Sequence, residues 1–405
     1  MEQHRKGRYI MKTLSLFSNI GVAEAYLSAI GVDIVLANEL VARRAELYSQ
    51  IYPNTEMICG DITDEEVKTR IIERAKSLGV TAIMAAPPCQ GMSRAYRTKK
   101  ADDERNLLIL PVIEMTKKLR PKHVFIENVP AFSDTIIHVN NSITTIADQI
   151  NKELGKQYHI SSSRIDTMNF SVPQTRKREI ILLTRRDVSE LWRIPKEDTS
   201  LVSLEDAIGD LPSLDPKITD ISEKELRSLF PEFLSKLKNA QKISKWHKPP
   251  THIKRQVVTM MHTPTGKTAF DNDKHIPIKS DGKPVVGYKS TYRRLRWSDP
   301  ASTVTMDNRK ISSQNNVHPG RYIGQNEFGD AIYSDARALS LFEIMRIMSL
   351  PDDWPLPDNV NEAFVRSVIG EGIPPLFVKK VFDEIMSKSE IHENHESRLP
   401  QEVTN

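Results

Sequence analysis

A cysteine at position 89 stands in a setting that suits nucleophilic chemistry. It belongs to the peptide Ala-Pro-Pro-Cys-Gln-Gly-Met-Ser at residues 86–93, directly after the apolar run Ala82–Ala86. The run is typical of a buried strand, and two prolines fix the backbone φ angles ahead of the cysteine. A thiolate is the strongest nucleophile among protein side chains, and a helix N-terminus after the loop would lower the pKa of the thiol. We therefore interpret Cys89 as a nucleophile, and Cys59, inside another apolar run, as a buried structural cysteine.

Two further peptides place polar side chains at strand ends. In Phe-Ile-Glu-Asn-Val-Pro at residues 125–130, an apolar run ends in Glu127, whose carboxyl group can act as a general acid or hydrogen-bond a substrate ring. In Gln-Thr-Arg-Lys-Arg at residues 174–178, strand alternation puts the glutamine, Arg176 and Arg178 on one side, an arrangement that suits a phosphate or carboxylate. Each peptide has a plainer alternative: a helix N-cap or surface acid for the glutamate, and a solvated charged edge for the arginines.

The elements that must position these peptides alternate along residues 12–185. Amphipathic stretches predict helices, one over residues 22–30 and one that begins with a capping box at Thr63 and Glu66 and ends near Gly79. This alternation predicts an α/β fold with a doubly wound, mostly parallel sheet, which binds ligands beyond the carboxyl ends of its strands. The runs that predict its strands are Leu14–Phe17, Ile34–Ala37, Met57–Cys59, Ala82–Ala86, Val124–Ile126 and Ile180–Leu183.

The bulk composition excludes several classes of protein. The chain has 405 residues, of which 39% are hydrophobic and 27% charged, as in a globular protein with more than one domain. Two cysteines exclude a disulfide framework and suit a reducing cytosol. No run of 18 or more apolar residues and no apolar leader appear, so we expect a cytoplasmic protein without a membrane span.

The pattern becomes irregular after about residue 187, which predicts a second, smaller domain with short β-rich runs at Gln256–Met260 and Ser302–Met306. Residues 242–310 hold 15 Lys and Arg against 5 Asp, a local net charge of +10; because the whole chain carries +4, the remainder carries −6. Such asymmetry is expected of a segment that meets phosphates, with an ordinary basic surface as the alternative. Its histidines lack metal-ligand spacing with cysteines, so we expect no metal site: these are His247, His252, His262 and His275.

Taken together, Pro-Cys-Gln, Glu-Asn-Val and Gln-x-Arg-x-Arg, in this order at strand ends, closely resemble the motifs of the DNA cytosine-5 methyltransferases. The resemblance implies a Rossmann-like, S-adenosylmethionine-dependent methyltransferase sheet with a smaller DNA-recognition domain. It implies that Cys89 adds to carbon 6 of a cytosine flipped out of a specific duplex sequence, that Glu127 contacts N3 and the exocyclic amine, and that carbon 5 receives the methyl group. The further residues that it assigns to this site are Arg178 near O2, Arg176 in support, and Gln90 and Ser93 on the DNA-facing loop.

The resemblance also implies a site for the donor S-adenosylmethionine, which leaves as S-adenosylhomocysteine. Phe17 would stack on the adenine, and Gly21 would let the backbone pass close to the methionine part. Asn19 stands where the family has a glycine, and asparagine tolerates left-handed backbone. Glu39 matches the acid at the ribose hydroxyls, and Asp61 the acid at the adenine amine. The remaining expected donor contacts are Ile20, Ile62, Pro88 and Glu371, the last in place of the family's asparagine.

The resemblance places target recognition between the third motif and Leu339–Trp354, which resembles the family's penultimate motif. Ser302–Thr305 resembles a short element of that region whose first threonine, here Thr303, contacts a phosphate near the flipped base. Candidates for base or phosphate contacts are Arg293, Arg294, Arg296 and Arg309. The domains expected are a catalytic and donor-binding domain at 12–190, a target-recognition domain at 191–337, a returning segment that completes the catalytic domain at 338–388, and a disordered tail at 389–405.

Duplex DNA is the expected partner of a monomeric enzyme, and family analogy adds a cognate restriction endonuclease in the same bacterial cell. A tRNA cytosine-5 methyltransferase with the same chemistry is the alternative, although members of that kind have a shorter recognition region than residues 191–337. A catalytically silent DNA-binding homologue is a third hypothesis. It predicts the loss of Cys89, Glu127 or an arginine of the third motif, and all are present.

Overall fold

The computed structural model describes residues 10–88, 104–272, 274–287, 290–312 and 315–396. The chain divides into two compact units. The first unit comprises residues 1–167, 177–197 and 375–405, and the second comprises residues 168–176 and 198–374. These bounds differ from the expected domains: residues 168–176 and 338–374 belong to the second unit, and residues 191–197 to the first.

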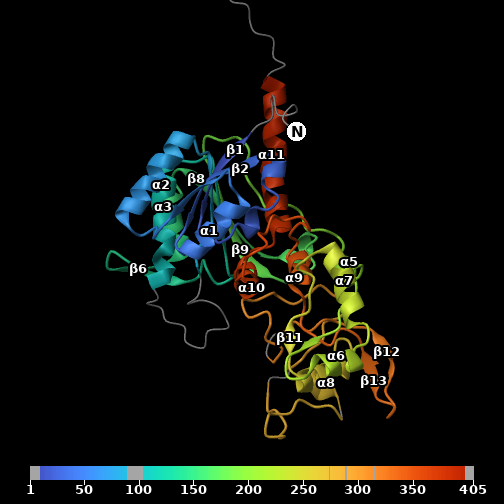
Figure 1. Cartoon of the computed structure of the whole chain (residues 1–405). Helices are drawn as coiled ribbons and strands as arrows, with labels where there is room; N and C mark the ends of the chain where they lie inside the picture. Colours follow the sequence, from blue (N-terminus) through green and yellow to red (C-terminus); the bar gives the residue numbers. More distant parts are fainter. Residues whose placement is uncertain (1–9, 89–103, 273, 288–289, 313–314, 397–405) are drawn as a thin grey trace, which may run out of the picture. The chain divides into compact units, whose positions relative to one another are not determined.

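The first unit is built on a seven-stranded sheet with the order β3-β2-β1-β4-β5-β9-β8 (Figure 1). The strands from β3 to β5 are parallel, whereas β9 is antiparallel to both β5 and β8. All six apolar runs lie in strands of this sheet, so the predicted α/β fold is confirmed. The strands are β1 Met11–Leu16, β2 Val32–Glu39, β3 Glu56–Cys59, β4 Ala82–Ala85, β5 His123–Asn128, β8 Tyr158–Asp166 and β9 Lys177–Arg185.

Helices cover both faces of this sheet, as expected for strands that are buried on both sides. Asp64 begins α2 by accepting hydrogen bonds from the backbone of Glu66 and Val67, and Gly79 ends it in a left-handed conformation. The other elements of the first unit are α1 Ala42–Ile51, α2 Glu65–Leu78, α3 Ile109–Leu119, α4 Ile146–Leu154, α11 Pro375–Glu396, the 3-10 turns η1 Val22–Glu24, η2 Ser28–Ile30 and η3 Glu104–Leu108, and the hairpin β6 Ile136–Val139 with β7 Ser142–Thr145. A further 3-10 turn, η4 Thr167–Phe170, crosses into the second unit.

Three local predictions need correction. The capping residue of α2 is Asp64, and Thr63 instead donates to Asp61. The helix expected over residues 22–30 is replaced by two 3-10 turns, which lie between the left-handed residues Gly21 and Gly31. The tail expected from residue 389 continues as helix, since α11 runs to Glu396.

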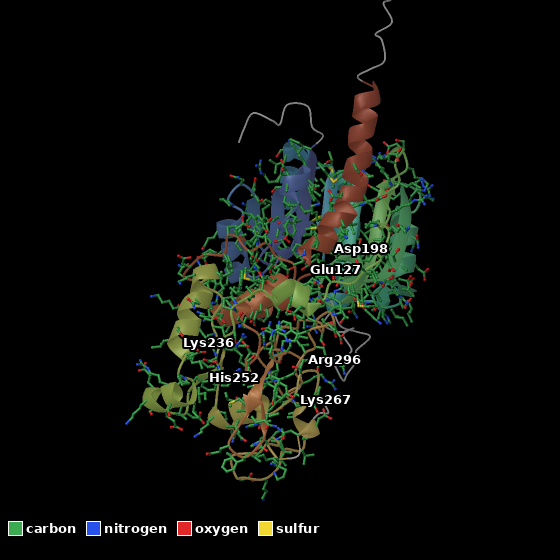
Figure 2. The ribbon with its side chains drawn as sticks, turned by 90° about the vertical axis from the view of Figure 1, so that its right-hand side faces the viewer. Glu127, Asp198, Lys236, His252, Lys267 and Arg296 are labelled. Carbon is green, nitrogen blue, oxygen red and sulfur yellow. The ribbon has the colours of Figure 1, made fainter. Side chains whose placement is uncertain are left out.

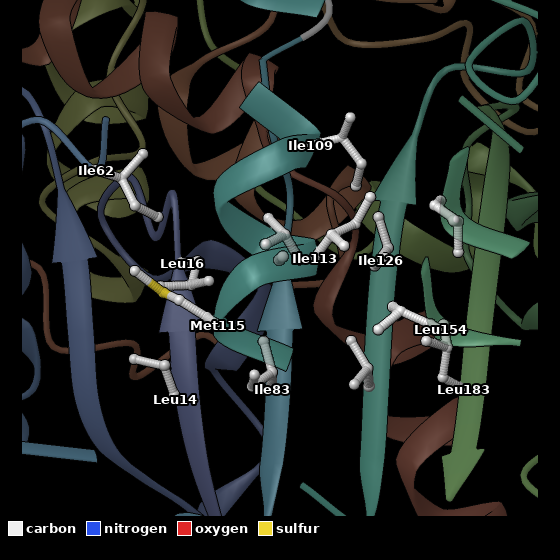
Figure 3. Packing of buried hydrophobic residues seen from close by; sticks show 14 of the residues in the cluster. Leu14, Leu16, Ile62, Ile83, Ile109, Ile113, Met115, Ile126, Leu154 and Leu183 are labelled. Carbon is white, nitrogen blue, oxygen red and sulfur yellow. The ribbon is translucent and has the colours of Figure 1, made fainter. Parts of the chain in front are cut away.

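The core of the first unit has two layers, one on each face of the sheet. On one face, alternate residues of the strands, such as Ile83 and Ile126, pack against α2, α3 and α4, as Figure 3 shows with Ile113 of α3. On the other face, Phe125 of β5 contacts Phe382 of α11, with ring centroids 5.7 Å apart. Trp192 also packs against Phe382 and donates from its indole nitrogen to the Val381 carbonyl oxygen at 2.8 Å. The last helix is therefore part of the core that supports the first strands.

The second unit is held by short elements around a buried ionic group. Arg337 is fully buried and binds Asp335 and Glu343 through its guanidinium, at 2.7 and 2.8 Å. Its paired charges allow an arginine to lie in the core. The elements are α5 Leu204–Ile208, β10 Lys217–Ile218, α6 Glu223–Leu229, α7 Phe233–Ile243, β11 Thr251–His252, α8 Lys254–Met261, η5 Ala269–Asp271, β12 Tyr322–Gln325, β13 Ala331–Tyr333, α9 Leu341–Ile347 and α10 Glu362–Glu371.

The β-rich run predicted at Gln256–Met260 lies inside α8, and Ser302–Met306 forms no regular strand. In α8, Val257 and Met260 share a face that packs into the apolar cluster of the second unit, so tertiary burial outweighs the strand preference of the valines. Over the parts of the chain described here, no helix combines the length and apolarity that a membrane crossing requires.

Candidate functional site

The carboxyl ends of five parallel strands meet at one edge of the sheet in the first unit. Leu16, the last residue of β1, pairs with Asn38 of β2 on one side and with Ala85 of β4 on the other. Glu39 pairs with Cys59, and Ala85 with Ile126. The strand order reverses at β1, the kind of point at which open α/β sheets bind ligands. The peptide at residues 86–88 follows β4 and the peptide at residues 127–130 ends β5, so both lie at this edge.

The loop after β1 has an unusual backbone. Phe17, Asn19 and Gly21 all have positive φ angles, of 58°, 51° and 78°. The backbone nitrogen of Ser18 donates to the Asn38 carbonyl oxygen at 3.0 Å, and Ile20 is buried. Asn19 thus adopts the left-handed conformation that the sequence predicts for it, in a place where a glycine would be unstrained. The loop turns sharply and returns its backbone to the sheet edge.

Glu39 joins this loop to the end of β2. One carboxylate oxygen accepts the backbone N–H of Asn19 and the other that of Val41, both at 2.9 Å. The side chain is 6% exposed, so these bonds compensate for the burial of a charge. Each carboxylate oxygen has a second lone pair, which leaves the group able to accept bonds from ligand hydroxyls.

The end of β3 supplies a second acid at the same edge. Asp61 is exposed, and its Oδ1 accepts from the backbone nitrogen and the hydroxyl of Thr63 at 2.8 and 2.7 Å. Ile62 beside it is buried. Cys59 is exposed, which corrects the prediction of a buried cysteine: Ile58 packs into the core, so strand alternation turns Cys59 outward at the end of an outer strand.

The peptide after β4 is tied to the end of β5 by Asn128. The side-chain nitrogen of this buried residue donates to the Pro87 carbonyl oxygen at 2.8 Å, and its oxygen accepts from the backbone of Val129 at 2.9 Å. Pro88, the next residue, is partly exposed. Sequence reasoning gave Asn128 no role, although its place in the Glu-Asn-Val peptide was a usable signal. Three predicted site residues lie outside the described part of the chain: Cys89, Gln90 and Ser93.

Glu127 and Arg178 form an ion pair at the end of β5. The Nε atom of Arg178 lies 2.5 Å from Oε1 of Glu127, and the two side chains are 13% and 11% exposed. Arg178 also donates from Nη1 to the Lys177 carbonyl oxygen at 2.7 Å. The guanidinium fixes the orientation of the carboxyl group, so the pair can present polar groups of both kinds to a planar ring.

Glu179, which sequence reasoning missed, holds the loop that follows Glu127. It is 3% exposed and pairs across the sheet with Asn128. Its carboxylate accepts the Ser162 hydroxyl at 2.8 Å and the backbone nitrogen of Ser133 at 3.1 Å. The charged residue that follows Arg178 in the sequence therefore supports the site from the opposite face of β9.

Gln174 and Arg176 precede β9, so the prediction that they alternate with Arg178 along one strand is wrong; both belong to the second unit. The buried Arg176 guanidinium donates to the carbonyl oxygens of Val304, Gly370 and Glu371 at 2.9, 3.0 and 3.2 Å. Gln174 accepts from the backbone nitrogen of Val304 at 3.0 Å. These contacts give Arg176 and Gln174 a structural role, because they fix backbone segments that are far apart in the sequence.

The segments that Arg176 joins contain two more predicted site residues. Thr303 is exposed and donates from its hydroxyl to the Thr175 carbonyl oxygen at 2.6 Å. Glu371, the last residue of α10, is partly buried. The backbone at Gly370 and the backbone at Thr305 approach each other closely, since a Cβ on Gly370 would lie 2.3 Å from the Thr305 carbonyl oxygen. Only glycine fits at position 370 without moving the Thr303 segment.

The four candidate DNA-contacting arginines separate into two kinds. Arg294 is fully buried and donates to the carbonyl oxygens of Met260, His318 and Asp335 at 2.8, 2.9 and 3.3 Å. This burial corrects the prediction that Arg294 contacts DNA. In the described part of the chain no hydrogen bond or ion pair engages the guanidinium groups of the other three, which are at least partly exposed: Arg293, Arg296 (Figure 2) and Arg309.

A buried acid that the sequence analysis did not single out lies behind the β1 loop. Glu24 of η1 accepts the Ser15 hydroxyl at 2.6 Å and is also bound by the Tyr48 hydroxyl. Burial raises the pKa of Glu24 to about 7. The sequence could have indicated a buried acid here, because Glu24 is the one acidic residue among the apolar residues of the predicted helix. Among the described residues, no three His, Cys, Asp or Glu side chains gather as a metal site.

Comparisons with known proteins agree with this geometry. A family model of C-5 cytosine-specific DNA methylases matches residues 11–387. The chain is 41% identical over 380 residues to the Type II methyltransferase M1.HgaI of Avibacterium volantium, covering 93% of this chain and 98% of that protein. It is 24% identical to the Type II methyltransferase M1.HphI of Haemophilus parahaemolyticus, with 92% and 86% covered.

A solved structure extends the likeness to the fold. The crystal structure of DNMT2 from Spodoptera frugiperda matches with a TM-score of 0.56 at 17% identity, covering 92% of this chain and 99% of that one. The seven-stranded sheet therefore has the Rossmann-like fold of these methyltransferases. With a family match along nearly its whole length and a 41% identical relative, the chain belongs to the C-5 cytosine-specific DNA methylase family.

Proposed function

We propose that this DNA cytosine-5 methyltransferase acts on a cytosine flipped out of a specific duplex sequence, through a covalent bond from Cys89 to carbon 6. The observation that carries the proposal is the Glu127–Arg178 ion pair at the carboxyl edge of the sheet. Asn128, the residue after Glu127, ties this strand to the peptide that precedes Cys89. An acid and a guanidinium held at the edge where the peptide leading to Cys89 begins suit chemistry on a planar, polar ring.

In the proposed reaction the Cys89 thiolate forms the S–C6 bond, and the C5–C6 π electrons move to carbon 5. Glu127, as a general acid, shares its proton with N3 and accepts from the exocyclic amine, and the Arg178 guanidinium donates near O2, so that both stabilise the negative charge that develops on the ring. The proton returns to Glu127 when the thiolate leaves. Carbon 5 then carries the electron density needed to accept an electrophilic methyl group. When a base removes the proton from carbon 5, the C5–C6 double bond forms again and the thiolate leaves. Glu127 and Arg178 thus act on the ring, whereas Arg176 acts through the backbone that it fixes.

S-adenosylmethionine supplies the electrophilic methyl group when it is bound, and the residues of the β1–β3 edge fit it. Glu39 has lone pairs left for ribose hydroxyls, and exposed Asp61 can accept from an adenine amine. Gly21 holds the left-handed turn of the β1 loop at this edge. The remaining residues proposed to hold the donor are Phe17, Asn19, Ile20, Ile62, Pro88 and Glu371.

The second unit is proposed to read DNA. Its basic segment suits the phosphate backbone, and Arg293, Arg296 and Arg309 are unengaged by other side chains in the described region. Thr303 is proposed to contact a phosphate, and Gln90 and Ser93 to line the DNA-facing loop. Extrusion of the base costs a few kcal/mol, which contacts to the distorted duplex must offset. By analogy with Type II relatives, we infer a monomeric enzyme that protects the sites of a cognate restriction endonuclease.

The proposal is tested by bisulfite sequencing of a mixed-sequence plasmid incubated with the full chain and S-adenosylmethionine. Protected cytosines within one short recurring sequence are expected, together with complete loss of protection in Cys89→Ala. Protection that persists in Cys89→Ala would exclude the covalent mechanism. A parallel incubation with tRNA distinguishes the alternative substrate: cytosines protected in tRNA alone would replace duplex DNA as the substrate.

A further inference from the structure

The turn at Gly21, in the proposed donor site, is covered by an aromatic ring from a distant part of the sequence. A Cβ added to Gly21 would lie 2.1 Å from Cε2 of Tyr52, so the ring rests directly on the glycine. The Tyr52 hydroxyl donates to the Gly21 carbonyl oxygen at 2.6 Å. One side chain therefore contacts the turn both through its ring and through a hydrogen bond.

Tyr52 is itself held in place from several sides. It is the C-terminal cap of α1, where its backbone nitrogen donates to the Tyr48 carbonyl oxygen at 2.8 Å. The rings of Tyr48 and Tyr52 lie with their centroids 5.0 Å apart. The next turn is fixed to β2, because the Thr55 hydroxyl donates to the Ile34 carbonyl oxygen at 2.7 Å. Ordering the Tyr52 ring thus costs little when a ligand binds.

A second contact fixes α1 to the far side of the same loop. Tyr48 is fully buried, and its hydroxyl donates to Glu24, which also accepts the Ser15 hydroxyl of β1 at 2.6 Å. Glu24 follows Gly21 by three residues and is buried as well. Strand β1 and the turn are therefore bound to one pair of tyrosines, Tyr48 and Tyr52, which are one helical turn apart.

We propose that Tyr52 is a positioning residue for the methyl donor: its ring and hydroxyl hold the left-handed Gly21 turn in the conformation that receives the methionine part of S-adenosylmethionine, with Tyr48 and Glu24 anchoring it. This inference rests on the proposed donor site. When the Gly21 turn is already held in the binding conformation, the ligand does not have to order it. The affinity for S-adenosylmethionine is then not reduced by other conformations of the turn in the free protein.

The test compares Tyr52→Phe with Tyr158→Phe. Each change removes one phenol hydroxyl that donates to a backbone carbonyl in the first unit, since the Tyr158 hydroxyl donates to the Pro121 carbonyl oxygen at 2.9 Å. Tyr158 begins β8 and lies in the part of the sheet away from β1. The two variants therefore lose a similar bond, and only one loses it at the donor turn.

Calorimetric titration of the full chain with S-adenosylmethionine should give a Kd about three- to ten-fold higher for Tyr52→Phe, the effect of one neutral hydrogen bond. Steady-state methyl transfer should place this change on the KM for the donor far more than on kcat. Tyr158→Phe should bind the donor like the unchanged protein. An unaltered Kd in Tyr52→Phe, or equal increases in both variants, would overturn the inference. Absence of donor binding by the unchanged protein would instead overturn the proposed donor site.

Discussion

The side-chain nitrogen of Asn128 donates to the carbonyl oxygen of Pro87 at 2.8 Å, and so connects the strand that carries Glu127 to the peptide two residues before Cys89. Asn128 does not touch the ring in the proposed reaction. It acts through the backbone, and it keeps the loop after β4 in register with the end of β5. The position of Pro87 relative to the strand that carries Glu127 therefore depends on one amide.

Removing this amide should impair the chemical step. We expect Asn128→Ala to lower the single-turnover rate of methyl transfer by about 10- to 100-fold, because a buried carbonyl loses its partner and the loop before Cys89 is released. Single-turnover kinetics with tritiated donor measure this rate. The Kd for S-adenosylmethionine, measured in parallel, should stay within about two-fold, since the side-chain hydrogen bonds of Asn128 go to Pro87 and Val129 and none goes to Glu39 or Asp61. A rate equal to that of the unchanged protein would contradict the positioning role.

Neutralising the proposed ring contact should have a larger effect. Glu127→Gln retains the size of the side chain but loses its charge and its ion pair with Arg178. We expect the rate of methyl transfer to fall by about 10²- to 10⁴-fold, the usual range for a general acid or base. The affinity for duplex DNA, measured by fluorescence anisotropy, should change much less. A variant that transfers methyl groups at the normal rate would remove Glu127 from the mechanism.

Adjacent arginines should respond in opposite ways. Arg294→Ala leaves three buried carbonyls without their donor, so we expect a loss of about 2–4 kcal/mol in the free energy of unfolding. Arg293→Ala should leave stability nearly unchanged, weaken DNA binding and reduce the slope of binding against salt by about one. Urea unfolding and salt-dependent anisotropy measure the two effects. Weakened DNA binding without destabilisation in Arg294→Ala would reverse our assignment.

Acid should destabilise the first unit through His123. Burial lowers the pKa of this histidine from 6.5 to about 4, and Phe125 and Trp192 lie beside it on the α11 face. Between pH 6.5 and 4 the unfolded chain binds a proton that the folded chain does not, so stability present above pH 6.5 falls as the pH is lowered. The full effect is about 3 kcal/mol. His123→Phe should flatten this part of the curve of unfolding free energy against pH; an identical slope in both proteins would contradict the burial effect.

The sequence predicts this structure where the local pattern of apolar residues matches the burial of those residues in the folded chain, and fails where the two differ. Strands β1, β4, β5 and β9 were predictable because both of their faces are largely buried, which demands continuous apolar runs. The role of Arg294 was not predictable, since two consecutive arginines look alike until packing encloses one of them. Cys59 was misjudged for a related reason: an apolar run indicates a strand but not which strand lies at the edge of the sheet.

The motifs of the candidate site were predictable from the sequence, but the hydrogen bonds that hold their residues in place were not. The order of Cys89, Glu127 and Arg178 along an alternating pattern identified the family, and the sheet topology brings Glu127 and Arg178 to within 2.5 Å. The contacts that hold the site come from residues without a motif of their own, such as Tyr52 and Glu179. Such contacts join positions that are far apart in the sequence, and no periodicity reports them.

The position of α11 has a consequence for how the protein is made. This helix packs against η1 and against Phe125, so the face of the sheet behind the first strands is covered by the last helix of the chain. During synthesis, the ribosome must therefore deliver the whole of the second unit before the first can bury Phe125 and Trp192. Until then the nascent sheet exposes a large apolar face, which is the kind of surface that chaperones bind. Losing Phe382 to a premature stop codon would thus remove packing from Phe125 and Trp192, which are translated 257 and 190 residues earlier.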